Sequence, residues 1–334
     1  MTPPAPEPPH FDQEAGAWVL SRYADVVAAL REPLLCPEAA AGEDVFESRD
    51  DTGRLRIRAE ALEALSGASL AEWRKRMEPL ARCAVRVLPI GRPVDLVSDF
   101  ALPWCLTLAI EVVETESCDR DRLAQLSAHV FAGIGAPEDP EVRSRAAEAT
   151  AELERLFHGG SLPMREPAFV ALAQTLPRLM GSLWLALFQH PSEVARLRGQ
   201  PDLLPGAVEE LLRFAGVARR VWRHATADIG LAGARIRRGD RIMLMLASAN
   251  RDPVQFPDPD RLDVTRRVTN QLALGTGRNS CVGAALLRMA LAVATAALLE
   301  RFTGADLAGT PDWRTGSGYA FPTSLPVRFQ TSSF

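Results

Sequence analysis

The chain of 334 residues has few cysteines, and their spacing excludes two common uses of this residue. There are 5 of them, an odd number, and no two form a Cys-x-x-Cys pair. A disulfide framework needs paired cysteines and a zinc site needs close ones, so neither is expected. Scattered free thiols are typical of a reducing cytoplasm, and we therefore expect a cytoplasmic protein. The cysteines are Cys36, Cys83, Cys105, Cys118 and Cys281.

The sequence also lacks an excess of positive charge and any apolar run of membrane-spanning length. Its formal net charge is −4, which argues against binding to nucleic acid by bulk attraction. No run reaches the roughly 20 apolar residues that a transmembrane helix needs. Residues 1–10 are rich in proline and show no apolar signal-peptide core. We therefore expect a protein that binds neither nucleic acid nor a membrane.

The rest of the composition is that of a globular protein, with 47% hydrophobic and 24% charged residues. Residues 1–16 are predicted to form a flexible arm, and residues 17–334 a single domain. Helical periodicity outweighs short strand patterns, so the expected fold class is mainly α with a small β region. Helices are predicted at 22–31, 70–88, 95–113, 119–131, 140–157, 166–190, 191–199 and 204–214, and short strands at 18–20 and within 223–246.

A glycine-rich loop with one cysteine stands directly before a long apolar helical run at 284–299. The loop spans residues 274–283, and Gly275 and Gly277 permit the positive φ angles of a tight turn. Cys281 stands near the start of the helix, where unpaired N–H groups and the helix dipole favour a thiolate. A lone thiolate suits one axial ligand to one metal, and haem iron is the best-known case. The alternative is a buried cysteine that only packs in the core.

Two helical segments carry polar residues that either bind a ligand or only stabilise the fold. Pro177 stands inside the most apolar helix and is expected to kink it. Gln174 and Thr175 precede this kink, and Thr175 either faces a ligand or bonds back to the preceding turn. Glu210 and Arg213 stand one turn apart, and they form either a surface pair or a buried pair that needs a further partner.

Together these residues resemble the cytochrome P-450 family, from about residue 183 to residue 302. The helix with Glu210 and Arg213 resembles the family's Glu-x-x-Arg helix, and Arg261 resembles the arginine that completes its buried triad. Cys281 falls on the thiolate position of the haem loop. The resemblance implies a cytochrome P-450-like fold lacking some lid helices. It also implies haem b (iron protoporphyrin IX) as cofactor, with its iron held by Cys281.

The resemblance implies further residues around the haem. Arg223 resembles the arginine at a strand start that holds a haem propionate, and Arg76 resembles an arginine on a basic helix that also serves the haem. Asn279 stands where the family usually has His or Arg, so it can donate a hydrogen bond but adds no charge. The other positions of the haem loop are Leu274, where the family usually has Phe, and Gly275, Gly277 and Gly283.

The helix expected on the oxygen side of the haem departs from the family. The acid–Thr pair aligns with Gln174 and Thr175, so the alcohol remains, but the acid has become an amide that releases no proton at neutral pH. Leu172 aligns with the small residue that leaves room for dioxygen, and it is expected to crowd that space. One or two helices that cover the substrate are expected to be missing between residues 157 and 168.

Three functions follow from the resemblance and its departures. The first is a haem-thiolate monooxygenase of specialised metabolism, acting on a small organic or carrier-linked metabolite, with Thr175 and Gln174 as catalytic residues. The second is a haem-dependent peroxide user, lyase, dehydratase or isomerase. The third is a haem-free binding module. For the first function, a ferredoxin-type partner is expected on the basic helix, whose cations are Arg74, Lys75, Arg76, Arg82 and Arg86.

Overall fold

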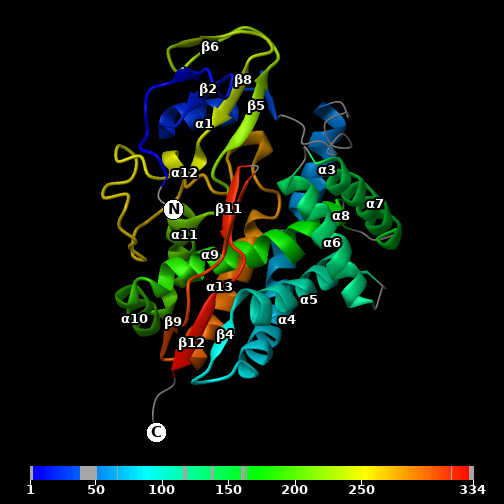
Figure 1. Ribbon diagram of the computed structural model, residues 1–334, viewed down its shortest axis with the longest axis vertical. Helices are drawn as coiled ribbons and strands as arrows, with labels where there is room; N and C mark the ends of the chain where they lie inside the picture. Colours follow the sequence, from blue (N-terminus) through cyan, green and yellow to red (C-terminus); the bar gives the residue numbers. More distant parts are fainter. Residues whose placement is uncertain are drawn as a thin grey trace. The chain divides into compact units, whose positions relative to one another are not determined.

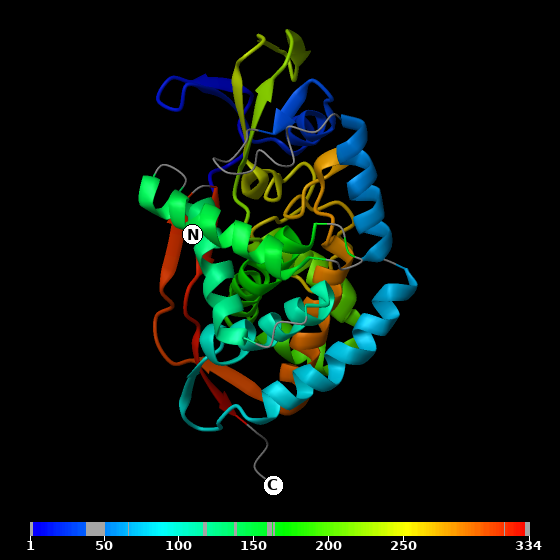
Figure 2. The same ribbon diagram turned by 90° about the vertical axis from the view of Figure 1, so that its right-hand side faces the viewer.

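The computed structural model describes residues 3–37, 51–65, 67–115, 119–136, 139–158, 162, 164–316 and 318–330, so Cys118 lies outside the described residues. The chain divides into two compact units, and each combines segments that are far apart in the sequence (Figures 1 and 2). Unit 1 comprises residues 1–38, 206–281 and 318–320, and unit 2 comprises 39–205, 282–317 and 321–334. Each unit is described by itself, and the single domain expected for residues 17–334 stays a prediction.

Unit 1 is built on a five-stranded sheet with the strand order β1-β2-β8-β5-β3. β2 pairs with β8 in parallel, and the other neighbours are antiparallel. The strands are β1 (His10–Asp12), β2 (Ala17–Leu20), β3 (Leu35–Pro37), β5 (Val221–Ala225) and β8 (Arg241–Leu244), with a separate hairpin of β6 (Ile229–Leu231) and β7 (Ala234–Ile236). The helices are α1 (Tyr23–Arg31), α11 (Leu204–Ala215), whose first two residues belong to unit 2, α12 (Leu246–Ala249) and the short 3-10 turn η4 (Gly277–Asn279).

Helix α1 packs on this sheet through one apolar face. Val26, Ala29 and Leu30 recur at helical spacing, and all three are buried in the same core cluster as Ile242 and Leu244 of β8. At the start of α1 the carboxylate of Asp252 accepts a hydrogen bond of 2.8 Å from the backbone N–H of Tyr23. An anion at a helix N-terminus satisfies one of its unpaired donors, so Asp252 also stabilises the helix.

The N-terminal arm is more ordered than predicted. His10 to Asp12 form β1, which pairs with Val19 to Ala17 of β2. The rings of Phe11 and Trp18 meet edge to face, with centroids 5.8 Å apart. The prediction of a flexible arm over residues 1–16 was wrong for this strand, because its order comes from pairing with β2 and not from an apolar pattern of its own.

Unit 2 is mainly helical, which confirms the expected fold class. Its helices are α3 (Asp51–Ala64), α4 (Ala68–Arg86), α5 (Leu102–Val113), α6 (Arg120–Gly135), α7 (Pro140–Leu156), α8 (Arg165–Val170), α9 (Leu176–Phe188), α10 (Pro191–Gly199) and α13 (Ala284–Arg301), with the π-helical turns η1 (Val97–Ala101) and η2 (Ala171–Thr175) and the 3-10 turn η3 (Pro201–Leu203). The strands are β4 (Pro93–Asp95), β9 (Gly304–Leu307), β10 (Trp313–Gly316), β12 (Pro326–Gln330) and β11 (Tyr319–Pro322), whose last two residues belong to this unit. β4, β12 and β9 form a three-stranded sheet.

Helices α4 and α13 form one side of the core of unit 2, and Figure 2 shows them side by side. Arg301, in the last turn of α13, donates to the carbonyl oxygens of Val85 and Leu88 at 2.8 and 3.0 Å. These carbonyls close the C-terminal end of α4, where a cation offsets the negative end of the helix dipole. Trp184 of α9 donates a buried hydrogen bond of 3.0 Å to Thr295 of α13, which fixes a third helix to the pair.

A long apolar helix, Arg165–Phe188, consists of α8, η2 and α9 without a break. Its length and composition would allow it to cross a membrane, but 83% of its apolar window is buried inside the protein. Such burial is typical of the core helix of a soluble protein. The kink expected at Pro177 stays a prediction. The π-helical turn η2 lies just before Pro177, which stands in the first turn of α9, where a missing N–H is tolerated.

The segment before this long helix contains α6 and α7, and the loss of covering helices between residues 157 and 168 stays a prediction. α6 and α7 pack against each other, and each begins at an aspartate that accepts backbone N–H groups, Asp119 and Asp139. α7 ends at Leu156 and α8 begins at Arg165. Between them the described residues 157, 158, 162 and 164 form no helix.

Candidate functional site

The cysteine loop of unit 1 is a tight turn closed by its own backbone. Gly275 and Gly277 have φ angles of 69° and 76°, which side chains other than glycine rarely adopt. The N–H of Cys281 donates to the carbonyl oxygen of Leu274 at 2.8 Å, and this bond joins the two ends of the loop. Cys281 is half-buried and stands three residues before Ala284, the first residue of α13. The predicted thiolate position is therefore held by a rigid turn.

The loop is fixed against helix α1 at Gly277. A Cβ atom on this residue would come within 3.0 Å of the carbonyl oxygen of Leu30 and 3.5 Å of Cα of Arg31. Backbone atoms cannot yield to a side chain as a flexible group can, so both the positive φ angle and the close approach require glycine. Gly283 differs, because a Cβ atom there would meet no atom within 4 Å. Gly283 is therefore not required by a close approach of other atoms.

Arg278, the arginine within the cysteine loop, contacts another part of unit 1. Arg278 donates to the carbonyl oxygen of Pro33 at 3.0 Å, and its Nη2 atom lies 3.9 Å from the sulfur of Cys36. Arg223, the predicted propionate-binding residue, lies in β5 and is 7% exposed. Its Nη1 atom donates to the carbonyl oxygen of Trp222 at 2.6 Å. The haem contacts of Arg223 and Asn279 stay predictions.

The buried Glu–Arg pair is present, but its third member was predicted wrongly. Glu210 and Arg213 have side chains that are 0% exposed, and they share two hydrogen bonds of 2.7 and 2.8 Å. The guanidinium that joins them is that of Arg266, whose Nε atom donates to Glu210 at 3.1 Å. Arg261 is exposed and contributes only its carbonyl oxygen, which lies 3.4 Å from Arg213.

The reason for this error lies in the turn that contains Arg261. Asp258 has a positive φ angle of 48°, and the N–H of Arg261 bonds back to its carbonyl oxygen at 3.1 Å. Arg213 also donates to the carbonyl oxygens of Asn250 and Pro259, both at 2.9 Å. The proline-rich segment is thus fixed through its carbonyl groups, and the side chain that completes the cluster comes five residues after Arg261.

The residues predicted on the oxygen side lie together in the π-helical turn η2 of unit 2. Leu172 and Gln174 are buried, at 7% and 5% exposure, and Thr175 is half-buried. Gln174 donates from Nε2 to the hydroxyl of Ser127 at 2.8 Å. Among the described residues the Thr175 hydroxyl has no hydrogen-bond partner, so it does not bond back to its helix as Thr107 does to Pro103.

Arg76 has partners other than the predicted haem. Its Nη1 atom lies 3.6 Å from a carboxylate oxygen of Glu111 in α5, and its guanidinium lies over the ring of Trp73. The side chain is 60% exposed. Within unit 2, Arg76 is therefore a surface residue of α4, and the structure gives no support to the haem role predicted for it.

Sequence reasoning missed one residue of this region, Arg178, which stands one turn after Gln174. Its Nη1 atom donates to both the backbone and the side-chain oxygen of Gln174, at 2.6 and 2.9 Å. Burial lowers the pKa of the Arg178 guanidinium to about 10, and the nearby charge of Arg314 contributes to the shift. The available signal was an arginine inside the most apolar helix, four residues after the altered acid position.

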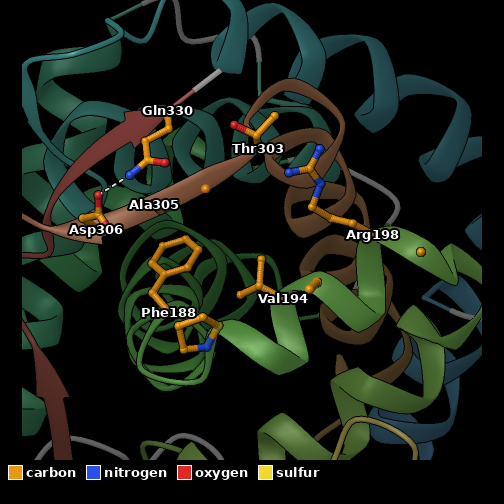
Figure 3. A pocket seen from close by; sticks show the side chains of 11 residues that line it. Phe188, Val194, Arg198, Thr303, Ala305, Asp306 and Gln330 are labelled. Atoms are coloured by element: carbon orange, nitrogen blue, oxygen red, sulfur yellow. Dashed lines mark hydrogen bonds between the residues drawn. The ribbon is translucent and has the colours of Figure 1, made fainter. Parts of the chain in front are cut away.

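A surface pocket of about 560 Å³ lies elsewhere in unit 2, between α9, α10 and β9 (Figure 3). Phe188 and Val194 form its apolar side, and Arg198 and Thr303 bring polar groups to it. Gln330 and Asp306, on the adjacent strands β12 and β9, are hydrogen-bonded to each other on one side of it. None of the predicted site residues lines this pocket, so it is separate from the candidate site.

The residues present fit a cofactor held by one sulfur. In the part of the chain that the structure describes, no three His, Cys, Asp or Glu side chains form a group that could hold a bare metal ion. Cys281 instead offers one half-buried thiol, three residues before the first residue of α13. This donor set suits a cofactor that brings its own equatorial ligands and needs one axial thiolate, as haem does.

Comparisons with known proteins agree with this donor set. A family model described as Cytochrome P-450 matches residues 196–319. Cytochrome P-450 107B1 of Saccharopolyspora erythraea is 30% identical over 360 residues, covering 93% of this chain and 89% of that protein. Nocardicin C N-oxygenase of Nocardia uniformis is 32% identical over 359 residues, also covering 93% of this chain and 89% of that protein.

Solved structures show the same fold. The crystal structure of CalO2 has a TM-score of 0.84 at 24% identity, covering 98% of this chain and 94% of that chain. The hydroxylase LnmA of the leinamycin pathway of Streptomyces atroolivaceus has a TM-score of 0.81 at 28% identity, covering 93% of this chain and 90% of that chain. The two relatives that are 30% and 32% identical over 93% of this chain show that it belongs to the cytochrome P-450 family, whose members are haem-dependent oxidoreductases.

Proposed function

We propose that this protein is a haem-thiolate monooxygenase of specialised metabolism, with haem b as its cofactor and Cys281 as the axial ligand. The observation that carries the proposal is the loop of Cys281, which is closed by the 2.8 Å bond to Leu274 and held against α1 at Gly277. A rigid loop keeps the sulfur in one place, and the start of α13 favours its thiolate form. When bound, the thiolate-ligated haem supplies the oxygen and one-electron chemistry of the family.

Two residues of unit 1 would hold the carboxylates of the cofactor. Arg223 brings a buried cation and Asn279 an uncharged donor. Arg278 is already used by Pro33, so it does not replace the charge that Asn279 lacks. Arg223 would therefore carry most of the electrostatic contribution to holding the haem propionates.

Thr175 would be the catalytic hydroxyl on the oxygen side. It stands at the end of a π-helical turn, and such turns occur frequently at functional sites. Because its hydroxyl has no partner among the described residues, it can donate a hydrogen bond to a reacting group without breaking another. Gln174 would not carry protons, since its amide is occupied by Ser127 and Arg178.

The amide of Gln174, at the position where the family has an acid, favours a second candidate. This is a haem enzyme that uses peroxide or does not activate dioxygen. Splitting dioxygen requires protons, and η2 contains no acidic side chain to deliver them. Peroxide already carries protons, and a lyase, dehydratase or isomerase needs none at this step. Turnover driven by NAD(P)H and a ferredoxin would support the monooxygenase, whereas turnover only with hydrogen peroxide would support the second candidate.

The substrate would be a small organic or carrier-linked metabolite. The relatives include an enzyme named Mycinamicin IV hydroxylase/epoxidase, from Micromonospora griseorubida, at 29% identity. A structural neighbour at 22% identity, P-450 BioI, was solved in complex with an acyl carrier protein that carries a fatty acid. These names place related proteins among enzymes of small and carrier-bound molecules, and we extend only this substrate class to the present chain.

A ferredoxin-type partner would bind the basic helix α4. Lys75 and Arg82 are already paired with Glu72 and Glu300 at 2.7 and 3.1 Å. With Arg76 also paired, the positive charge offered by α4 is smaller than its sequence suggests. We therefore expect weak, salt-sensitive association, which screening by 0.5 M salt would abolish.

The optical spectrum of the purified, reduced protein under carbon monoxide tests the ligand. We expect the band of a thiolate-ligated haem, and we expect Cys281→Ala to remove it. Cys36→Ala is the matched control, because Cys36 is also a half-buried thiol of unit 1, near the same loop, and should leave the band unchanged. A Cys281→Ala protein with the unaltered band would refute the assignment, and a protein without any haem band would identify a haem-free binding module.

A further inference from the structure

Arg178 is a half-buried cation without an acidic partner among the described residues. Its Nη1 atom is bonded twice to Gln174, while among the described residues its Nε and Nη2 atoms have no hydrogen-bond acceptor. No described carboxylate forms an ion pair with it. Taking a guanidinium even partly out of water has a cost, which an arginine inside a protein normally recovers from a carboxylate. Here the compensating charge is missing from the protein.

The surroundings of Arg178 are aromatic. Its guanidinium carbon lies 4.5 Å from the ring centroid of Phe131 in α6 and 5.6 Å from that of Phe321 in β11. The two rings contact each other, with centroids 5.8 Å apart. Ring faces stabilise a cation, but they do not neutralise it. The arrangement therefore combines an apolar wall with an uncompensated positive charge.

A second cation lies close to the first. Arg314 of β10 is near enough to lower the pKa of Arg178 by repulsion. Its Nη2 atom lies 3.5 Å from where a Cβ atom of Gly135 would stand, at the end of α6. Arg314 also has no carboxylate partner among the described residues. Arg314 is exposed, so water partly screens its repulsion of Arg178, and an anion bound at Arg178 would offset that repulsion.

Arg178 lacks a carboxylate partner among the described residues because position 174, which faces it, is a glutamine. Its Nε2 group donates to Ser127, so its Oε1 atom is directed to Arg178 at 2.9 Å. The acid that the family has at this position would form an ion pair with Arg178 and cancel its charge. The amide holds the guanidinium in place while leaving it positive. The departure from the family at position 174 thus preserves a positive site.

We propose that Arg178, with Arg314 beside it, binds an oxyanion group of the substrate, a carboxylate or a phosphate monoester attached to an apolar body that packs on Phe131 and Phe321. The planar guanidinium can give Nε–H and Nη2–H to two oxygens of one such group. Gln174 is a positioning residue in this site. The inference deepens the proposed function by naming the substrate class, and it rests on that function for the reaction that follows binding.

Calorimetric titration of the haem-loaded protein with three probes of equal chain length tests the proposal. The probes are decanoate, decyl phosphate and uncharged decan-1-ol. We expect at least one anion to bind about 10-fold more tightly than the alcohol, which corresponds to about 1.4 kcal/mol. Preference for decanoate identifies a carboxylate substrate, and preference for decyl phosphate alone identifies a phosphate monoester. Equal binding of all three probes would overturn the proposal.

Two variants locate the preference. Arg178→Met should bring the anions to within about 2-fold of the alcohol, and Gln174→Glu should do the same by supplying an internal carboxylate while leaving Arg178 in place. Arg155→Met, at an exposed arginine of α7, is the control and should keep the preference. If both test variants fold, by circular dichroism, and keep the preference, the anion binds elsewhere and the assignment is wrong.

Failure of this proposal is distinguishable from failure of the proposed function. Anion preference is measured by binding, and the thiolate by the spectrum of the reduced protein under carbon monoxide. A protein with the thiolate band but no anion preference would retain the function and lose this site. A protein with the preference but no thiolate band would retain the site and lose the function.

Discussion

Two arginines of this protein, one buried and one half-buried, differ in whether a carboxylate neutralises their charge. Arg213 in unit 1 is fully enclosed and shares two hydrogen bonds with Glu210, while Arg266 satisfies the same carboxylate from the other side. Arg178 in unit 2 has a glutamine amide and two aromatic rings but no carboxylate among the described residues. The first charge is neutralised within the fold. The second remains positive and is available to something that the chain does not supply.

This difference in charge compensation indicates that Arg213 belongs to a structural site and Arg178 to a binding site. A charge cluster that is satisfied internally contributes to folding, and loss of either partner leaves a buried ion behind. An uncompensated cation lowers the stability of the free protein and gains a partner only when a ligand binds. Residues that lower stability in this way are expected at functional sites, where activity and stability are in conflict.

The largest effect is expected from breaking the satisfied cluster. Glu210→Ala would leave Arg213 buried without a carboxylate and should lower the free energy of unfolding by about 3–5 kcal/mol. Urea denaturation followed by circular dichroism measures it. Arg261→Ala is the control, and since Arg261 contributes only its backbone, it should change stability by less than about 0.5 kcal/mol. A large loss in the control would restore Arg261 to the cluster.

A gain in stability, instead of a loss, is expected when the uncompensated charge of Arg178 is removed. Burial lowers the pKa of Arg178 to about 10 in the folded protein, so the cost of burying its charge is fully present at pH 7 and is relieved only above about pH 10. Arg178→Met removes this cost and should raise the free energy of unfolding by about 1–4 kcal/mol at pH 7.

The measurement is denaturation at pH 7, with Arg155→Met as the neutral control on an exposed helix face. A loss of stability in Arg178→Met would contradict the comparison, because it would show that Arg178 supports the fold as Arg213 does. The gain should also shrink when both proteins are compared well above pH 10, where the wild-type guanidinium begins to lose its charge.

The smallest change in stability is expected in the cysteine loop, where the substitution affects the backbone conformation and no charged group. Gly277→Ala forces a side chain into a positive φ angle and toward the carbonyl oxygen of Leu30, so stability should fall by about 1–2 kcal/mol. Gly206→Ala, in helix α11 with open space around it, should be neutral or stabilising. Thermal unfolding measures both, and equal effects would show that the loop tolerates a side chain.

Much of the fold could be predicted from local patterns. Apolar spacing predicted α1, and glycines at 275 and 277 predicted a tight turn before α13, because these features depend on residues close in sequence. β1 could not be predicted, since its order depends on pairing with β2. The role of Arg266 could not be predicted either, because the sequence does not show which of two nearby arginines a turn directs toward Glu210.

Within the site, the residue types were readable in advance but their partners were not. The thiol at 281, the amide at 174 and the alcohol at 175 are properties of the sequence, and so are the reactions that each can support. The partners of the arginines depend on contacts that form only in the folded chain. Arg213 faces Glu210 and Arg76 pairs with Glu111, whereas no described carboxylate faces Arg178. The sequence therefore decided the local chemistry, while the tertiary structure decided which charges are neutralised, because neutralisation depends on distance in space.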